Sequence, residues 1–454
     1  MGRIGAYAGL LAAAVAGLLS PQNTAPAPRE GSDEPVVVST EHPRLFLRPA
    51  RLRLLRRERE RQSMRWRQFE ALIAGNAPMP EPGFAAALDY QASGNAAAGH
   101  RAIAWALGNT TDLRQMALVY DWCQTLLSDA ERRELAARIA RRMAETAPDD
   151  SIPAASARAL AAVALFDEVP QVPDRELNRL VHKWWNGTIA PALRAGHNVV
   201  PRETSYALME LLHALADNTR VDLRESCPGF FRDFPIEHLM GYYPAPYPGA
   251  QNEYYIGVMR HPGEPDPRAA ALDRAAELAM VAYDPNAPET QVLQGWLMHD
   301  RFLMRSTFGS PYEFLWANPY QPGLSYYNVP LVYYNPDFGR LFLRSSWEDD
   351  ADWFGLFDGT MQMFTGGHAT AIDAARRTEP LWLKEATICF AGSGRKFQLT
   401  LDEPAPVFVV SLEPRHAYEV EVDDEEMFEA ASDAGGILEL DDVPAGRAAG
   451  VRMK

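Results

Sequence analysis

The sequence predicts an α+β protein in two parts, a helical region over residues 42–325 followed by an antiparallel β-sandwich region over residues 326–454. Two observations predict this order. From His42 to about Trp316, apolar residues recur at helical spacing between short Pro, Gly and Asn breaks. From Tyr326 onward, short aromatic and β-branched stretches alternate with turn residues at intervals of about ten residues. The length of 454 residues also exceeds what one compact core fills, which favours two or three domains.

The N-terminus predicts an exported protein, with a signal peptide over residues 1–20 and a polar, Pro-containing linker over residues 21–41. Arg3 supplies the positive start, and an uninterrupted run of small and apolar residues extends from Ile4 to Leu19. This run is shorter than the roughly 20 residues that a spanning helix needs. We therefore expect a periplasmic or extracellular protein, with an uncleaved N-terminal anchor as the alternative and no other contact with a membrane.

Three segments of the helical region carry helix start signals. Ser128 and Glu131 form a capping box, and Asp266 followed by Pro267 gives a cap and a proline at the first turn. A third helix opens at Pro288, and its predicted buried face carries Val292, Trp296, His299 and Leu303. We expect about ten to twelve helices in all. Sustained helical hairpins predict a toroid or an irregular bundle.

The β region consists of short strings broken by turn signals, such as LVYYNPDFGRLFLRSSW and DWFGLFDGTMQMFTGG. PVFVVSL, AYEVEV and GILELDD continue the pattern toward the C-terminus. This spacing predicts a sandwich or stacked antiparallel sheets. Residues 404–454 either form a separate small acidic β module or complete the same sheets.

The charge is unevenly distributed along the chain. The formal net charge is −16, and residues 401–442 alone carry 14 acidic residues against one arginine. A nucleic-acid partner is therefore not expected, because phosphate binding needs clusters of Lys and Arg. The helical half is nearly neutral, so an acidic ligand is compatible with it. Ten arginines crowd residues 44–67, which predict either an exposed first helix or a patch for a heparin-like ligand.

No metal site or cofactor is predicted. The three cysteines match no zinc or redox motif, and the apolar setting of Cys123 predicts a buried, inert thiol. The acidic run at residues 423–426 lacks the alternating ligands and central Gly of an EF-hand, which favours a solvated turn.

Two strings indicate a family. EHPRLFLRPARLRLLRR and GRLFLRSSWEDDADWFGLFDG resemble the openings of the helical and β parts of the heparinase II/III-like polysaccharide lyases. The resemblance covers about residues 42–365. It implies an α/α toroid, an incomplete barrel of helical hairpins, followed by a β-sandwich. It also implies cleavage of acidic polysaccharides by β-elimination, in which one group neutralises the uronate carboxylate and a Tyr or His removes the adjacent proton.

Two segments supply the candidate site. In GHNVVPRETSY, Asn198 matches the neutralising Asn of the family, with His197 assisting, and it lies at the predicted start of a helix. The alternative is a capping or loop Asn beside a surface His. In YYPAPYPGAQNEYYIGVMRH, Tyr254 or Tyr255 is the candidate catalytic base or acid. The substrate-binding candidates nearby are Tyr243, Tyr247, Glu253 and Arg260. For the tyrosines the alternative is aromatic packing between helices.

Further candidates have stronger structural alternatives. Arg301 and Arg305 would bind a carboxylate as forks or lie on a solvated helix face. The helical spacing favours a buried core position for His299. His368 is a candidate catalytic residue in GGHATAIDAARRTEPLW, where the sequence departs from the family because a second His is missing, so a turn position is the alternative.

The sequence therefore predicts a polysaccharide lyase acting on a uronate-containing polysaccharide or oligosaccharide. The alternatives are a catalytically inactive glycan-binding toroid protein and a glycoside hydrolase with paired carboxylates, for instance Glu203 and Glu253.

Overall fold

The structure is a computed structural model that describes residues 38, 41–168, 171–248, 253–300, 304–423, 427–441 and 443–454. The predicted signal peptide, most of the linker, Arg301 and the acidic run from residue 424 to 426 lie outside these residues. All described residues belong to one compact unit, Val36–Lys454.

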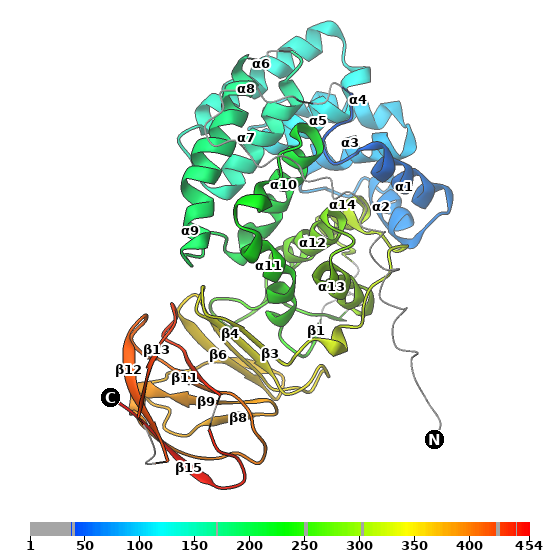
Figure 1. The fold of residues 1–454 in the computed structure, drawn as a ribbon. Helices are drawn as coiled ribbons and strands as arrows, with labels where there is room; N and C mark the ends of the chain where they lie inside the picture. Colours follow the sequence, from blue (N-terminus) through cyan, green and yellow to red (C-terminus); the bar gives the residue numbers. More distant parts are fainter. Residues whose placement is uncertain are drawn as a thin grey trace, which may run out of the picture. The chain divides into compact units, whose positions relative to one another are not determined.

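The helical region carries the helices α1 to α14 in the described residues (Figure 1). Their bounds are α1 (Pro49–Glu60), α2 (Met64–Ala74), α3 (Pro82–Ser93), α4 (Ala96–Ala106), α5 (Leu113–Trp122), α6 (Asp129–Thr146), α7 (Ile152–Leu165), α8 (Gln171–Asn178), α9 (Ala190–Arg194), α10 (Ser205–Thr219), α11 (Pro228–Met240), α12 (Pro267–Tyr283), α13 (Pro288–His299) and α14 (Gly309–Trp316). A π-helical stretch, η2 (Arg179–Ile189), joins α8 to α9, and short 3₁₀ turns include η3 (Arg202–Thr204) and η5 (Tyr326–Asn328).

The predicted helix starts are confirmed. The Ser128 hydroxyl accepts from the Glu131 backbone N–H while the Glu131 carboxylate accepts from Ser128, so both halves of the capping box form at α6. The Asp266 side chain caps α12 with Pro267 in its first turn, and α13 begins at Pro288.

The helices pack in a series. α3 contacts α4 and α5, and the contacts then continue from α5 to α7, α10, α12 and α14, which in turn touches α2 and α3. Large aromatic side chains fill the space between them, for example Trp122, Tyr312 and Trp316. The α/α toroid stays a prediction.

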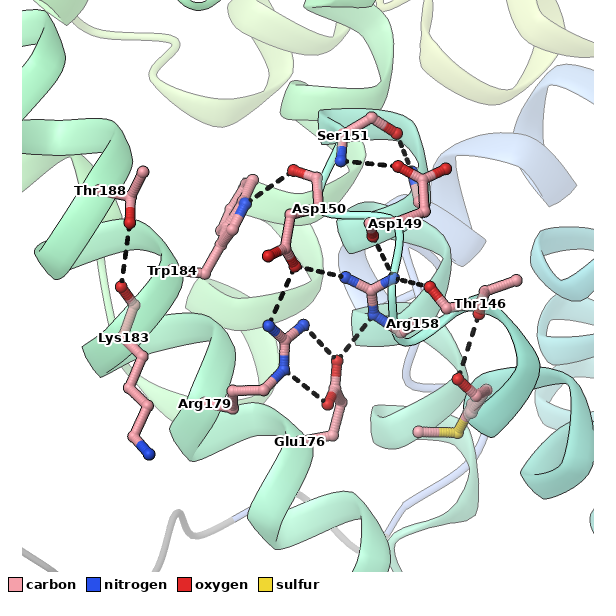
Figure 2. A network of polar contacts seen from close by, with 12 residues as sticks. Thr146, Asp149, Asp150, Ser151, Arg158, Glu176, Arg179, Lys183, Trp184 and Thr188 are labelled. Carbon is pink, nitrogen blue, oxygen red and sulfur yellow. Dashed lines mark hydrogen bonds and ion pairs between the residues drawn. The ribbon is translucent and has the colours of Figure 1, made fainter.

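One buried arginine holds a turn of the helical region in place (Figure 2). Arg158 of α7 is fully buried and donates to the carbonyls of Thr146 and Asp149, between α6 and α7. Its Nε also donates to Glu176 of α8 at 2.8 Å, and the same carboxylate accepts from Arg179. This network fixes the α6–α7 turn against the start of η2.

Helices give way to strands after η5. The bounds are β1 (Tyr247–Pro248), β2 (Glu253–Tyr254), β3 (Val332–Asn335), β4 (Arg340–Arg344), β5 (Trp353–Phe357), β6 (Thr360–Thr365), β7 (His368–Ala371), β8 (Leu381–Leu383), β9 (Ala386–Phe390), β10 (Lys396–Thr400), β11 (Val407–Val410), β12 (Ala417–Val422), β13 (Phe428–Ala431), β14 (Leu438–Leu440) and β15 (Ala448–Met453). β1 and β2 pair within the helical region, where the sequence predicted a Pro-rich loop.

In its described residues, the β region contains three sheets. The inner sheet has the order β3-β4-β5-β6-β7, the middle sheet β14-β11-β9-β8 and the outer sheet β10-β15-β12-β13. All of their strand pairs are antiparallel except β9 with β11. Residues 404–454 supply strands to the middle and outer sheets, which they share with β8, β9 and β10. An antiparallel β part after a helical part is the predicted order.

The strand alternation explains why the sheets stack. In the inner sheet, Leu341 and Phe354 point into a core shared with Ile388 of the middle sheet. The alternate residues, among them Phe342 and Trp353, join the large core of the helical region. β4 and β5 are therefore buried along their whole length, and the inner sheet is the surface that meets the helices.

The cysteines are all free and buried. The expected burial of Cys123 is confirmed, and burial raises the pKa of its thiol to about 12, which supports the prediction of an inert side chain. Within the described part of the chain, no helix combines the length and the apolar character that crossing a membrane requires.

Candidate functional site

A pocket of about 280 Å³ lies where the helical region meets the inner sheet, and we call it the interface pocket. Its walls are the segment before α10, the end of α11, the segment after β2 and the strands β4 and β5 with the turn that follows. The residues that line it are Asn198, Val200, Pro201, Arg202, Glu203, Phe234, Glu237, His238, Gly241, Val258, Arg260, Arg340, Phe342, Phe357 and Asp358. Two of the predicted site residues, Asn198 and Arg260, therefore share one pocket.

The segment that carries Asn198 is anchored on the β region. Gly196 has a positive φ of 77°, and a Cβ at this position would lie 1.9 Å from the Asp337 carbonyl oxygen, so a side chain does not fit. The neighbouring Ala195 carbonyl accepts from Arg415 at 2.9 Å. The helical conformation starts only at Arg202, so Asn198 is a loop residue and not the helix-start residue that the sequence indicated.

Asn198 uses both ends of its amide. Its oxygen accepts from the Val200 backbone N–H at 3.1 Å, and its nitrogen donates to Asp358 Oδ1 at 3.1 Å. Burial would raise the pKa of Asp358, but the charge of Arg340 and the hydrogen bonds from Asn198 and Arg340 outweigh it and lower that pKa. Asp358 is therefore a carboxylate at neutral pH. An amide nitrogen has two donor hydrogens, so one of them is free to point at a ligand.

Arg340 of β4 joins the two sides of the pocket. Its guanidinium pairs with Glu237 of α11 and donates to Asp358 Oδ1 at 2.9 Å. The Arg340 side chain is nearly buried, and its Nε has no hydrogen-bond partner among the described residues. Because a buried polar atom without a partner costs free energy, this N–H is a donor that a ligand or a water molecule would satisfy.

Behind the pocket lies a buried charge network centred on Arg202. Its guanidinium donates to Asp273 at 2.8 Å and to Glu277 at 3.1 Å, both on α12. Gly257 makes room for it, since a Cβ there would lie 2.4 Å from the Arg202 Nε. Burial, followed by the charge of Arg202, lowers the pKa of His238 far below its ordinary value, so this imidazole is neutral. The network supports the pocket wall, and its carboxylates are already occupied.

Arg260 differs from the other two arginines of the pocket. Its side chain is exposed, and within the described part of the chain it has no hydrogen-bond or ion-pair partner. Its backbone is fixed, because Gln362 of β6 donates to the carbonyls of Met259 and Arg260. Tyr243 donates to the same Gln362 at 2.7 Å and is buried between Trp353 and Phe364. Tyr243 therefore positions the Arg260 segment and does not present its ring to solvent.

The two candidate catalytic tyrosines are not among the residues that line the interface pocket. Both are nearly buried. Tyr255 donates to Asp349 and packs on Trp296, with ring centroids 4.7 Å apart. Burial and then the hydrogen bond to Asp349 raise the pKa of Tyr255, while burial and then Asp266 raise the pKa of Tyr254. Both side chains are thus proton-bearing at neutral pH.

The remaining candidates lie elsewhere or are simply exposed. Tyr247 donates to Glu264 at 2.6 Å, and Glu253 is exposed on β2. Arg305 lines a different pocket, beside Arg274 of α12, and Arg301 lies outside the described residues. His197 is exposed next to Asn198 but is absent from the pocket lining.

Two histidines of the sequence analysis are also exposed. His368 lies on the edge strand β7 and pairs with Thr365, at the far end of β6 from the Asp358 turn. Five residues of strand separate the two ends, or about 17 Å. His299 is exposed in the last turn of α13, so the expectation of a core histidine is wrong. The helix ends there, and of the described residues Val292, Trp296 and His299 on that face, Trp296 alone is buried.

Sequence reasoning missed four charged residues of the site, namely Arg202, Glu237, Arg340 and Asp358. Each has at least one partner far away in the chain; Glu237 and Arg340 are 103 positions apart, although Arg340 and Asp358 are only 18 apart. A weak signal existed in the Asp-Gly turn after β5, which placed a carboxylate at the end of a buried strand.

Comparisons with known proteins add little. Neither a scan against protein families nor a search of curated proteins finds a match. One solved structure, described as "Glycoside hydrolase", is similar over 82% of this chain and 71% of that chain, with a TM-score of 0.31 and 9% identity. A likeness at these values carries no argument about activity, so the site has to be interpreted from its own residues.

The pocket can bind an anion more readily than it can bind a metal. Among the described residues, no group of three or more His, Cys, Asp or Glu side chains is arranged to hold a metal ion. Its lining carries three carboxylates, on Glu203, Glu237 and Asp358. Beside them the pocket offers a free amide N–H on Asn198, the Nε of Arg340 and the guanidinium of Arg260, which has no ion-pair partner among the described residues and whose charge acts on Asp358. Donors and positive charge at one place are what a carboxylate ligand requires.

Proposed function

We propose that the interface pocket binds a uronate residue of an acidic glycan and that the protein cleaves this glycan by β-elimination. The observation that carries the proposal is the meeting of Asn198, Arg260 and Arg340 at one pocket. In this proposal the free N–H of Asn198 and the guanidinium of Arg260 hold the uronate carboxylate. Neutralising that carboxylate acidifies the adjacent C–H, which is the electrostatic part of the reaction.

The raised pKa values of Tyr254 and Tyr255 argue against either tyrosine as the catalytic base. A tyrosine serves as a base only when positive charge lowers its pKa, whereas the surroundings of Tyr254 and Tyr255 raise it. Neither tyrosine lines the interface pocket and both are nearly buried, so we assign them no proton-transfer role. His197, exposed beside Asn198, is the side chain we assign as base.

The test is an elimination assay on a panel of uronate polysaccharides, following the absorbance of the new C=C bond. We expect a signal from the wild-type protein and a loss of about 10²–10³ in kcat for Asn198→Ala, which removes one donor to the developing charge. Asn178→Ala is the matched control, because this amide bonds only within α8. Folded protein that gives no signal on any substrate would contradict the proposed reaction.

A second candidate is a glycan-binding protein without catalysis. It is favoured by the absence of Tyr254, Tyr255 and His368 from the pocket lining. Retention on an acidic glycan column, abolished by Arg260→Gln but without cleavage, would select it. For the hydrolase alternative, Glu203 lines the pocket whereas Glu253 does not. Hydrolysis adds water to the products and elimination does not, so product mass separates these reactions.

The site of action is part of the same proposal. A protein that cleaves or binds an extracellular polysaccharide needs to leave the cytoplasm, and residues 1–20 were interpreted as the export signal. Cell fractionation and N-terminal sequencing of the recovered protein test this.

A further inference from the structure

A second, larger pocket lies in the helical region, and we call it the α1 pocket. It has a volume of about 860 Å³ and is lined by α1, by the C-terminal ends of α10, α12 and α14 and by the chain after α14. The interface pocket adjoins the opposite end of α10. Twelve residues of helix, from Ser205 to Asp217, separate the two ends, or about 18 Å. The two pockets are therefore different places on the molecule.

The lining of the α1 pocket is positively charged. It includes five arginines and two aspartates. Asp217 pairs with Arg48 at 3.1 Å, and Asp222 pairs with Arg224 at 2.9 Å, so both aspartates are occupied. The other three arginines are Arg51, Arg53 and Arg57, and none of them has a carboxylate within ion-pair distance in the described chain. An excess of three positive charges at one pocket is notable in a protein whose net charge is −16.

His213 adds no positive charge to this lining. Burial lowers its pKa to about 3, and its Nε2 lies 2.9 Å from the Ala279 carbonyl, which a neutral imidazole can satisfy as a donor. The charge of the pocket is therefore set by the arginines alone over the physiological pH range.

Aromatic rings hold the guanidinium groups of Arg51 and Arg57 in place. Arg51 lies over Trp316 at 5.6 Å and donates to the Trp316 carbonyl at 2.9 Å. Arg57 lies over Tyr320 at 4.7 Å, and the Tyr320 hydroxyl is itself fixed by Arg61 at 3.2 Å. A stacked guanidinium keeps its N–H edges free for a ligand, and its restrained plane reduces the entropy lost on binding.

The charge on Arg51 is also incompletely compensated. Burial lowers its pKa to about 10, against a weaker opposing effect of Asp217. Burial removes water that would stabilise the charged guanidinium, and an anion bound next to it would replace that stabilisation.

We propose that the α1 pocket is a second binding site for an anionic oligosaccharide, with its carboxylate or sulfate groups on Arg51, Arg53 and Arg57. The volume suits a ligand of several rings and is far larger than a single inorganic anion needs. The choice of a glycan among polyanions rests on the proposed function. A polymer bound at both pockets would be held by two attachments on one molecule, which raises its residence time.

The test is calorimetric titration of the full chain with a galacturonate tetrasaccharide and with a heparin-derived tetrasaccharide. We expect at least one of the two tetrasaccharides to bind, and to bind at two sites, the interface pocket and the α1 pocket. Arg53→Gln combined with Arg57→Gln should weaken one site by at least about tenfold, because each lost charge-assisted contact is worth roughly one decade of affinity. Both side chains are exposed, so the variant should fold. Arg133→Gln combined with Arg141→Gln, two exposed arginines of α6, removes the same charge and should leave both sites intact.

The interface pocket is tested in the same titrations. Asn198→Ala should weaken the other site and spare the α1 pocket, so failure of the proposed function and failure of this inference give different patterns. Unchanged binding in the Arg53–Arg57 variant, or an equal loss in the α6 control, would overturn the inference. Tighter binding of inorganic triphosphate than of either tetrasaccharide at the α1 pocket would overturn the assignment to a glycan.

Discussion

Replacing Arg340 with methionine tests whether the interface between the helical region and the inner sheet depends on paired charges. Arg340 is 8% exposed, and its partners Glu237 and Asp358 are 12% and 36% exposed. Methionine keeps much of the apolar volume of the side chain but removes the cation from both carboxylates. Glu237 is then left nearly buried without a counter-charge, while Asp358 is exposed enough for water to solvate it.

The expected cost follows from these exposures. Removing one partner of a buried ion pair destabilises proteins by about 3–5 kcal/mol, chiefly through the charge that is left behind. Because only Glu237 is well buried, we expect a loss near the lower end, about 3 kcal/mol. Adding Glu237→Gln should recover part of this loss, since the orphaned charge is then gone. The double variant should therefore be more stable than the sum of the two single changes predicts.

Urea unfolding at pH 7 measures these differences from the transition midpoints at unchanged slope. Arg376→Met is the matched control in the same β region, because the Arg376–Asp373 pair is largely exposed and should contribute less than about 1 kcal/mol. If Arg340→Met cost no more than Arg376→Met, or if the double variant were simply additive, the ion pairs would not be what holds this interface.

Three further outcomes follow from buried groups. Arg158→Met should destabilise the protein by about 2–3 kcal/mol and speed proteolysis at the α6–α7 turn, because two carbonyls lose their donor while Glu176 keeps its pair with Arg179; intact resistance to protease would contradict this. Burial lowers the pKa of His213 to about 3 in the folded protein, whereas a histidine in the unfolded chain titrates near pH 6.5. Below about pH 6.5 the unfolded chain therefore binds a proton that the folded chain does not, so the free energy of unfolding should fall as the pH drops. Between pH 7 and pH 5, the free energy of unfolding measured by urea titration should therefore fall by about 2 kcal/mol less for His213→Gln than for the wild type. An identical fall in both proteins would argue against a buried neutral imidazole. None of the three cysteines should react with a thiol reagent in the folded protein, and rapid labelling of any one would show that it is reached by solvent.

Local signals in the sequence were good guides to the elements. The capping box of Ser128 and Glu131 and the start of α12 at Asp266 involve residues three positions apart or fewer, so their geometry depends on little else. Strand alternation in GRLFLRSSW likewise predicted two faces for β4. It did not predict that both faces would be covered, because this depends on a middle sheet whose strands begin some forty residues later.

The site was harder to predict because the positions and the burial of its side chains depend on partners that are distant in the sequence. Tyr243 was a candidate for stacking on a sugar, yet Gln362 of β6 accepts its hydroxyl hydrogen 119 positions away and the ring is buried. Asn198 was chosen for its residue type, and its place in the pocket follows from Asp358, which the sequence did not connect to it. Arg260 is exposed in the folded chain, and only its neighbours reveal that it borders a pocket.

The interface pocket and the interface that joins the two regions are made of the same contacts. Glu237 and Asn198 come from the helical region, Arg340 and Asp358 come from the inner sheet, and each pairs across the boundary. Glu237 and Asp358 thus hold the regions together, whereas Arg260 and Glu203, both exposed, have no ion-pair partner among the described residues. A ligand carboxylate that binds here adds a negative charge beside Arg260 and Arg340, so it should also strengthen the contact between the regions. Binding of an acidic sugar and stability of the interface are therefore expected to rise together, and Arg340→Met should weaken both.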